Sequence, residues 1–529
     1  MKLANGPYSV TRLLPALTSG LMMTAAFPRP ELSWLAWVAL VPLLYSLRDL
    51  PAGRRFAAGF TAGWVHYLTL GYWLIATIMV YGGVPLVPAL LFYLALAACL
   101  AGYLALFALF LGWSAKKPPV CLLTAPFLWV GLEYLRAHLF SGLPWALLGH
   151  SQYKRLYLIQ IADIAGVYGL SFVIVLVNAA ITCLLLRLRR QSWRGSPTNN
   201  GAVFLMGALA VTALVLTWGY GRQRLRAVDR ELLRAPRRLV AVVQGNIDQA
   251  QKWDFPFRLA SVEKHLALAE KTTALRPDLI VMPETALPFY FFYEKGLTDL
   301  VCQRVREMGV SLLAGAPAYQ QVPGGMLFYN SAFLIRPDGK AADRYDKTHL
   351  VPFGEYVPFG SWLPFIDKLV AGVGDFTPGE AGRVIKLNGC GLAVQICYEI
   401  IFPDICRRMV QHGADIIINI TNDAWYGKTA APYQHFSMTV FRAVENRRSL
   451  VRSANTGISG FIDPAGRIRA STGLFVEAAA VYEVPVLTVP TIYAAAGDLP
   501  AKSCVILTLI VICRRSIRRF FKKKDEESF

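Results

Sequence analysis

Residues 394–404 read VQICYEIIFPD, and this stretch decides how the second half of the chain folds. An apolar run through Val394 and Ile396 ends on the thiol of Cys397, and a helix is expected after Pro403, because proline suits a first helical turn. Cys397 is therefore expected at the end of a strand. Rigid backbone holds such a side chain while a ligand can still reach it, as a nucleophile requires. The competing interpretation is a small buried apolar residue.

Two other segments place a charged residue in a similar setting. Residues 278–284 read DLIVMPE, a short buried-type strand that stops on the carboxylate of Glu284. Residues 345–355 read YDKTHLVPFGE and carry the ammonium of Lys347. This segment is too irregular for an amphipathic helix and too apolar for a solvated loop. Glu284, Lys347 and Cys397 are called the acyl-transfer trio below.

The acyl-transfer trio forms a chemically complete set for moving an acyl group. A carboxylate can take the thiol proton, a thiolate can attack a carbonyl carbon, and a fixed ammonium can stabilise the oxyanion of the tetrahedral intermediate. Composition alone does not show that the three side chains converge.

Three motifs in order along the chain carry a family resemblance. MPE at 282–284, DKTHLVPFGE at 346–355 and CYE at 397–399 resemble the Glu-Lys-Cys signatures of the nitrilase superfamily. The form of the lysine segment, with hydrophobic spans on both sides, resembles one membrane-bound branch, the apolipoprotein N-acyltransferases, which finish bacterial lipoproteins. The resemblance covers essentially the whole chain, and three ordered motifs are more specific than one.

The resemblance implies a fold, a reaction and two substrates. The fold is an αββα nitrilase-like sandwich attached to a multi-pass α-helical membrane bundle; the sequence pattern alone gives only an α/β class. Cys397 would be the nucleophile, Glu284 the base and Lys347 the oxyanion group of a ping-pong reaction through a thioester. A phospholipid would donate the acyl chain, and the N-terminal S-diacylglyceryl cysteine of an apolipoprotein would accept it. No cofactor or metal is implied.

Further residues receive supporting roles from the same resemblance. They are Glu355, Tyr398, Glu399 and Trp253 around the active site. Trp145 lies in a loop predicted on the outer face, where it is either an interfacial anchor or lines the substrate entry, a role also given to Phe353. For Glu355 and Glu399 the implied roles are to orient Lys347 and the acceptor or to handle a second proton. A buried hydrogen-bonded brace is the alternative.

The composition indicates a membrane protein. Of the 529 residues, 55% are hydrophobic and only 17% are charged. The formal charge of +20 is typical of nucleic-acid binders too, but much of it lies in short basic clusters beside apolar spans. Such clusters set membrane orientation, so no nucleic-acid partner is expected.

Seven membrane spans are predicted before residue 227: 13–27, 34–47, 58–80, 84–113, 120–135, 161–186 and 202–220. A cleaved signal peptide is the competing interpretation of the first. Basic loops after the second, fourth and sixth spans favour the cytoplasm for those loops and for the N-terminus. The predicted domains are a bundle (1–227), a periplasmic catalytic domain (228–489) and a last span with a basic cytoplasmic tail (490–529).

Short β-type runs separated by amphipathic helices indicate the layered α/β domain. The predicted strands are 239–244, 279–282, 311–314, 331–335, 392–396, 416–420 and 460–462, and the predicted helices are 257–275 and 298–308. Asn330 and Asn422 are expected to be turn or capping residues.

The nine cysteines have neither a CxxC pair nor regular spacing, so neither a zinc site nor a disulfide framework is expected. A bridge among Cys302, Cys390 and Cys406 stays open.

Two other functions remain open on the sequence. One is a membrane-anchored nitrilase-type amidase that uses water as the acceptor. The other is a transporter or scaffold whose outer domain only binds ligands, although the spans lack a conspicuous series of buried charges or repeated broken helices.

Overall fold

The computed structural model describes residues 13–249, 255–356 and 376–527. These residues belong to two compact units. The first unit takes Met1–Tyr72, Val87–Arg222 and Asp498–Phe529, and the second takes Trp73–Leu86 and Gln223–Gly497.

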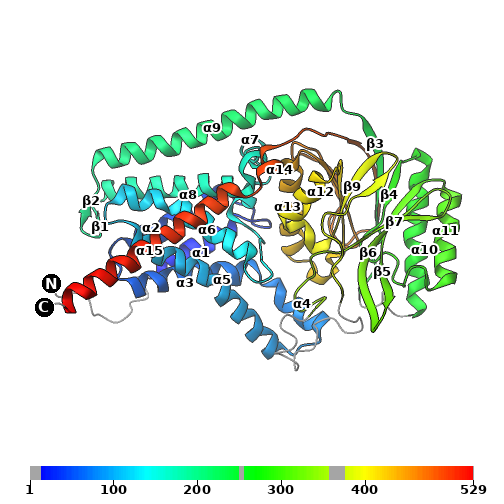
Figure 1. Cartoon of the computed structure of the whole chain (residues 1–529), viewed down its shortest axis with the longest axis horizontal. Coiled ribbons are helices and arrows are strands. Elements are labelled where there is room, and N and C mark those ends of the chain that lie inside the picture. The colour runs from blue at the N-terminus through cyan, green and yellow to red at the C-terminus, as the bar shows by residue number, and fades with distance from the viewer. Residues whose placement is uncertain (1–12, 250–254, 357–375, 528–529) are drawn as a thin grey trace. The chain divides into compact units, whose positions relative to one another are not determined.

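Helices build the first unit (Figure 1). They are α1 (Leu14–Ala25), α2 (Val41–Ser46), α3 (Ala52–Leu70), α5 (Leu86–Ser114), α6 (Pro118–His138), α7 (Leu156–Ile159), α8 (Ala162–Leu188), the greater part of α9 (Asn200–Leu232) and α15 (Leu499–Glu527). A small hairpin, β1 (Ser192–Trp193) with β2 (Ser196–Pro197), lies between α8 and α9 in the chain. Within the unit α6 packs against α8 and α15, and α1 packs against α3.

Among the described residues, four helices are long and apolar enough to cross a membrane, namely α5, α6, α8 and α9. A fifth candidate is the pair formed by α3 and α4 (Trp73–Gly82), which is bent by 53° between its halves. Helix α1 has 12 residues and α2 has six, fewer than the roughly 20 that a span needs. The seven predicted spans and the last span at 490–529 stay predictions.

Two six-stranded sheets form the centre of the second unit. The first has the order β14-β3-β4-β5-β6-β7 and the second has the order β13-β12-β11-β10-β9-β8. Strands of the first sheet are β3 (Arg237–Gln244), β4 (Leu279–Val281), β5 (Ser311–Val322), β6 (Gly325–Ile335), β7 (Ala341–Asp346) and β14 (Ala478–Pro485). Strands of the second are β8 (Ile385–Leu387), β9 (Cys390–Ile396), β10 (Ile416–Thr421), β11 (Ser449–Ala454), β12 (Gly460–Ile462) and β13 (Ile468–Ser471).

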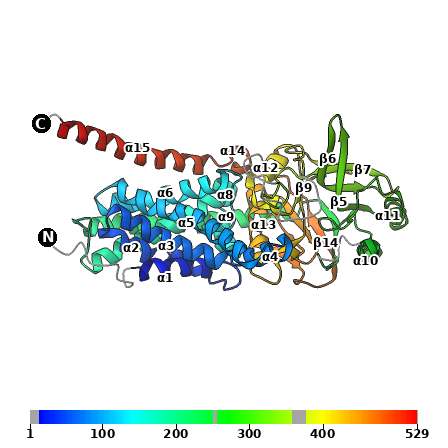
Figure 2. The ribbon, with the colours of Figure 1, turned by 90° about the horizontal axis from the view of Figure 1, so that it is seen from below.

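The two sheets pack face to face, with β3 against β11 and β6 against β9. Helices α10 (Phe255–Thr272) and α11 (Lys295–Met308) cover the first sheet, and α12 (Pro403–Gln411) and α13 (Ala431–Asn446) cover the second (Figure 1). The short α14 (Ile492–Ala496) packs against α12 and α13. Strands β5 and β6 form a long hairpin (Figure 2). This αββα sandwich is the predicted α/β architecture.

Apolar side chains that alternate along the strands form the core between the first sheet and its helices. Ala241, Ile280 and Leu312 from β3, β4 and β5 are fully buried beside Val262 and Leu266 of α10. Burial of this kind stabilises the domain by about 25 cal/mol per Å² of apolar surface. The core therefore makes the strand ends rigid supports.

Parallel pairing brings several strand ends to the same edges of the sandwich. Strands β9, β10 and β11 are parallel, with Ile396 opposite Ile420. Strands β3, β4 and β5 are also parallel. Because the carboxyl ends of parallel strands meet at one edge, polar residues that follow them come together there.

Candidate active site

Cys397 lies directly after β9 and starts the short 3-10 helix η6 (Cys397–Ile401). Its side chain is buried, at 6% exposure. Its φ is +54°, a left-handed conformation that is uncommon for a residue with a side chain. Such a conformation costs on the order of 1–3 kcal/mol and persists only where the surroundings hold it. The predicted position at a strand end is confirmed.

Glu399 supplies much of that support. Its Oε2 accepts a hydrogen bond from the backbone N–H of Ile396 at 2.7 Å. Its Oε1 accepts from the hydroxyl of Tyr345 at 2.9 Å, from the backbone N–H of Thr348 at 2.6 Å and from that of His349 at 3.1 Å. Burial raises the pKa of Glu399, while these donors act in the opposite direction. Glu399 thereby connects the turn at Cys397 to the lysine segment.

Glu284 stands on a loop after β4 that is pressed against β5. The backbone N–H of Leu287 donates to the carbonyl of Gly315 at 3.0 Å, and the N–H of Gly315 donates to Pro283 at 3.3 Å. A Cβ on Gly315 would lie 2.5 Å from the nitrogen of Thr285 and 2.7 Å from Cα of Glu284. The absence of a side chain at 315 is what lets the loop approach so closely.

Two asparagines hold the Glu284 carboxylate. The side-chain amide of Asn330 donates to Oε1 at 2.8 Å, and the backbone N–H of Asn422 donates to Oε2 at 2.9 Å. Asn330 was expected to be a turn or capping residue, and that expectation is wrong, because it lies within β6. Asn422 does cap the 3-10 helix η7 (Asp423–Tyr426) through its side chain, as expected.

Lys347 follows β7 and is 1% exposed. Its ammonium lies 2.9 Å from Oε1 of Glu355 and 3.9 Å from Oε1 of Glu284. Burial alone would lower the pKa of this lysine, but the carboxylates of Glu355 and Glu284 outweigh it and raise the pKa above the ordinary value. Lys347 is therefore a fixed positive charge. Glu355 also accepts from the side-chain amide of Asn330 at 3.1 Å.

Burial and the charge of Glu284 raise the pKa of the Cys397 thiol well above its usual range, and Lys347 opposes the shift. The resting cysteine is consequently a thiol rather than a thiolate. A thiol needs a base at the moment of attack. The ammonium of Lys347 lies 3.9 Å from the Glu284 carboxylate, and both groups are electrostatic neighbours of Cys397, so the three side chains share one site.

A buried polar network lies beside Cys397. Asp423 accepts from Arg452 at 2.8 Å and pairs with Nδ1 of His435 at 3.1 Å. Burial alone would raise the pKa of Asp423, but Arg452 and His435 hold it below its usual range. Burial chiefly raises the pKa of Tyr426, and its neighbours Cys397 and Asp423 act in the same direction.

This network was not predicted from the sequence. Its signal is the arginine inside SLVRSA, residues 449–454, where every side chain is buried. A guanidinium in a buried strand requires a polar partner.

Other predicted site residues lie in varied places. Tyr398 is buried and packs edge-on against Phe402, with ring centroids 5.1 Å apart. The backbone N–H of Phe353 donates to the carbonyl of Tyr356 at 2.8 Å within a turn. Trp145 is buried within the first unit, where its carbonyl accepts from Arg136 at 3.1 Å. Trp253 lies outside the described residues.

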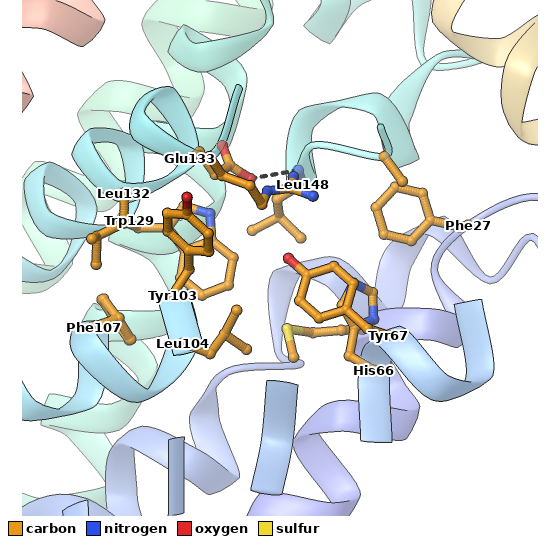
Figure 3. A pocket seen from close by; sticks show the side chains of 13 residues that line it. Phe27, His66, Tyr67, Tyr103, Leu104, Phe107, Trp129, Leu132, Glu133 and Leu148 are labelled. Atoms are coloured by element: carbon orange, nitrogen blue, oxygen red, sulfur yellow. Dashed lines mark hydrogen bonds between the residues drawn. The ribbon is translucent and has the colours of Figure 1, made fainter. Parts of the chain in front are cut away.

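The first unit contains a pocket of its own, lined by aromatic side chains and by Glu133, Arg136 and His66 (Figure 3). Glu133 accepts from the backbone N–H of Leu148 at 2.7 Å. The guanidinium of Arg136 lies over the ring of Tyr67 at 5.6 Å. Ionisable side chains buried among apolar helices are costly and usually functional.

All nine cysteines are free, including Cys302, Cys390 and Cys406. Across residues 13–249, 255–356 and 376–527, no group of three or more histidine, cysteine or acidic side chains is arranged to hold a metal ion.

An αββα sandwich that brings a buried cysteine, glutamate and lysine together is that of a carbon-nitrogen hydrolase, and residues 239–492 match the family model of that name. Residues 19–180 match the apolipoprotein N-acyltransferase N-terminal domain. The chain belongs to the apolipoprotein N-acyltransferase family. It is an acyltransferase and, with its apolar helices, a protein of the inner membrane.

Two curated relatives carry the family name. The apolipoprotein N-acyltransferase of Geobacter metallireducens is 40% identical over 509 residues, covering 95% of this chain and 96% of the relative. That of Chlorobaculum tepidum is 31% identical over 567 residues, covering 97% and 100%. Among solved structures, an amidase from Nesterenkonia sp. matches at 20% identity over 47% of this chain and 90% of its own, with a TM-score of 0.36.

Proposed function

We propose that the chain moves an acyl chain from a phospholipid to the α-amine of the N-terminal S-diacylglyceryl cysteine of apolipoproteins. The observation that carries this proposal is the placement of Cys397 in reach of two opposite charges, those of Glu284 and Lys347, at a buried strand end. Such a constellation supports covalent acyl transfer.

In the first half-reaction Glu284 takes the proton of the Cys397 thiol, and the thiolate attacks the ester carbonyl carbon of the phospholipid. The ammonium of Lys347 stabilises the oxyanion of the tetrahedral intermediate. Collapse breaks the bond to the glycerol oxygen, which takes the proton from Glu284 and leaves as lysophospholipid. A thioester on Cys397 remains.

In the second half-reaction the free α-amine attacks the thioester carbon. Lys347 again stabilises the oxyanion, and Glu284 takes a proton from the attacking nitrogen. The carbon–sulfur bond breaks, the proton returns to sulfur, and an amide is formed. Glu355 keeps Lys347 in place during both steps, and Trp145 and Phe353 are proposed to line the substrate entry.

The proposed arrangement in the membrane follows the charge pattern of the sequence. Residues 1–227 form the bundle, 228–489 the periplasmic catalytic domain and 490–529 the last span with its cytoplasmic tail, so both termini are cytoplasmic. Cysteine-specific labelling of reporters at Arg194 and Lys523, in intact and permeabilised cells, tests this topology. Labelling of Lys523 only from the outside contradicts the last span.

Mass spectrometry of the purified protein after incubation with phospholipid tests the chemistry. We expect an acyl adduct on Cys397 together with released lysophospholipid, and neither product from Cys397→Ala. Cys397→Ser should be nearly inactive, because an alcohol is far less acidic than a thiol. Release of free fatty acid without transfer to an added peptide amine would instead support an amidase that uses water.

A further inference from the structure

Helix α4 belongs to the second unit and packs against the turn η7, although its sequence, WLIATIMVYG, is that of an apolar helix. Trp73, Thr77 and Tyr81 follow one another at intervals of four residues. Residues at this spacing lie on one face of a helix. The face formed by these three side chains is called the α4 clamp below.

Every member of the α4 clamp contacts the turn η7. The hydroxyl of Thr77 donates to the carbonyl of Trp425 at 2.8 Å, and the hydroxyl of Tyr81 donates to the carbonyl of Ala424 at 2.9 Å. Trp73 meets the ring of Tyr426 edge-on, with centroids 4.9 Å apart. The ring of Tyr81 meets that of Trp425 in the same way at 4.8 Å.

The turn that the clamp holds is connected to two members of the acyl-transfer trio. Asn422, the residue before η7, donates its backbone N–H to Glu284 at 2.9 Å. Tyr426, at the other end of η7, meets the ring of His435 edge-on at 6.1 Å. Tyr426 is also an electrostatic neighbour of Cys397. A shift of η7 would therefore disturb the base and the surroundings of the nucleophile together.

The carbonyls that Thr77 and Tyr81 bind give the clamp its geometric precision. The Ala424 carbonyl also accepts the backbone N–H of Gly427 at 3.1 Å, and because a carbonyl oxygen has two lone pairs it takes the Tyr81 hydroxyl as a second donor. Two hydroxyls from one helix face thus fix the turn at two neighbouring points. Apolar contact alone would allow η7 to slide, because dispersion contacts lack direction.

We propose that Thr77 and Tyr81 are positioning residues for the acyl transfer. They hold η7 so that the N–H of Asn422 stays on Glu284 and Tyr426 stays against His435 beside Cys397. This inference rests on the proposed function for its substrate but not for its geometry.

The variants Thr77→Val and Tyr81→Phe each remove one hydroxyl and keep the shape of the side chain. We expect the double variant to form the Cys397 thioester about ten- to a hundredfold more slowly at saturating phospholipid, with an unchanged KM. Thr77→Ser keeps the hydroxyl and should stay close to wild type. Tyr293→Phe is the matched control, because its hydroxyl donates to the carbonyl of Tyr319 at 3.0 Å in an exposed position.

Alkylation of Cys397 by iodoacetamide, resolved by peptide mass spectrometry, provides a second measurement that needs no lipid. We expect the alkylation rate to change in the double variant, because η7 carries the N–H that holds Glu284, and to stay unchanged in Tyr293→Phe. If the wild type forms no thioester while the alkylation rate still differs between wild type and double variant, the proposed function is wrong and the positioning role stands. If the double variant is alkylated at the wild-type rate, the positioning role is overturned. A rise in KM without a fall in kcat overturns it as well.

Discussion

The side-chain amide of Asn330 donates to Glu284 at 2.8 Å and so connects the proposed base to the lysine segment. The same amide donates to Glu355 at 3.1 Å, and the Asn330 carbonyl accepts the backbone N–H of Lys347 at 2.8 Å. One residue within β6 thus fixes the positions of two carboxylates and of the lysine backbone relative to one another. An amide can do this because it donates two hydrogens through one nitrogen.

Asn330→Ala should slow thioester formation by about tenfold to a hundredfold, since a hydrogen bond to a charged group contributes roughly 1.5–3 kcal/mol. Asn330→Asp should be worse at neutral pH, because a third carboxylate would face Glu284 and Glu355, and it should recover partly in acid. Single-turnover rates against pH test both variants. Gln303→Ala, which loses an exposed amide–carboxylate contact of 2.8 Å, is the control. Equal rates in all three variants would remove Asn330 from the site.

Gly315→Ala should lower activity strongly, because the new methyl group would lie 2.5 Å from the nitrogen of Thr285 and displace the loop that carries Glu284. The thermal midpoint should fall as well, since overpacking a buried site costs about 1–3 kcal/mol. Gly296→Ala in α11 has open space around it and should change neither quantity. A Gly315→Ala protein with the wild-type rate of thioester formation would contradict this account of how Glu284 is placed.

The raised pKa of Cys397 predicts the pH dependence of its alkylation. Below the pKa the side chain is a thiol, so alkylation without substrate should be slow at neutral pH and should accelerate only above the range of an ordinary cysteine. Lys347→Met removes a positive charge and should move the profile to higher pH, whereas Glu284→Gln removes a negative charge and should move it to lower pH. Iodoacetamide rates at Cys397 from pH 6 to 10 measure the three profiles. At a given pH we expect Glu284→Gln to react fastest, the wild type more slowly and Lys347→Met most slowly.

Lys347 allows charge and position to be separated. Lys347→Met should lose roughly 2.7–4 kcal/mol of transition-state stabilisation, about a hundred- to a thousandfold in rate. Lys347→Arg keeps the charge but misplaces the donor, because the planar fork is larger, and should recover little. Thioester formation at low and high salt is the measurement. Near-full activity in Lys347→Arg, with equal inhibition by salt, would mean that the lysine only attracts anionic headgroups.

The local sequence was enough to locate the candidate catalytic residues along the chain. The apolar runs before Glu284 and Cys397 predict strands that end on a polar side chain; β9 ends directly before Cys397, and β4 ends at Val281, three residues before Glu284. Strand period, Pro403 at the start of α12 and the apolar composition of α5 and α8 are properties of a few consecutive residues, so they can be recognised without the fold.

Only the tertiary structure decided which residues hold the acyl-transfer trio in place. Asn330 contacts Glu284 across 46 positions of the chain, and Tyr81 contacts the carbonyl of Ala424 across 343. Such contacts arise from sheet register and from the packing of distant elements, and no periodicity in the chain records them. Asn330 therefore resembles a turn residue in the sequence, and Thr77 and Tyr81 resemble ordinary members of an apolar helix, until the fold brings their polar atoms to the site.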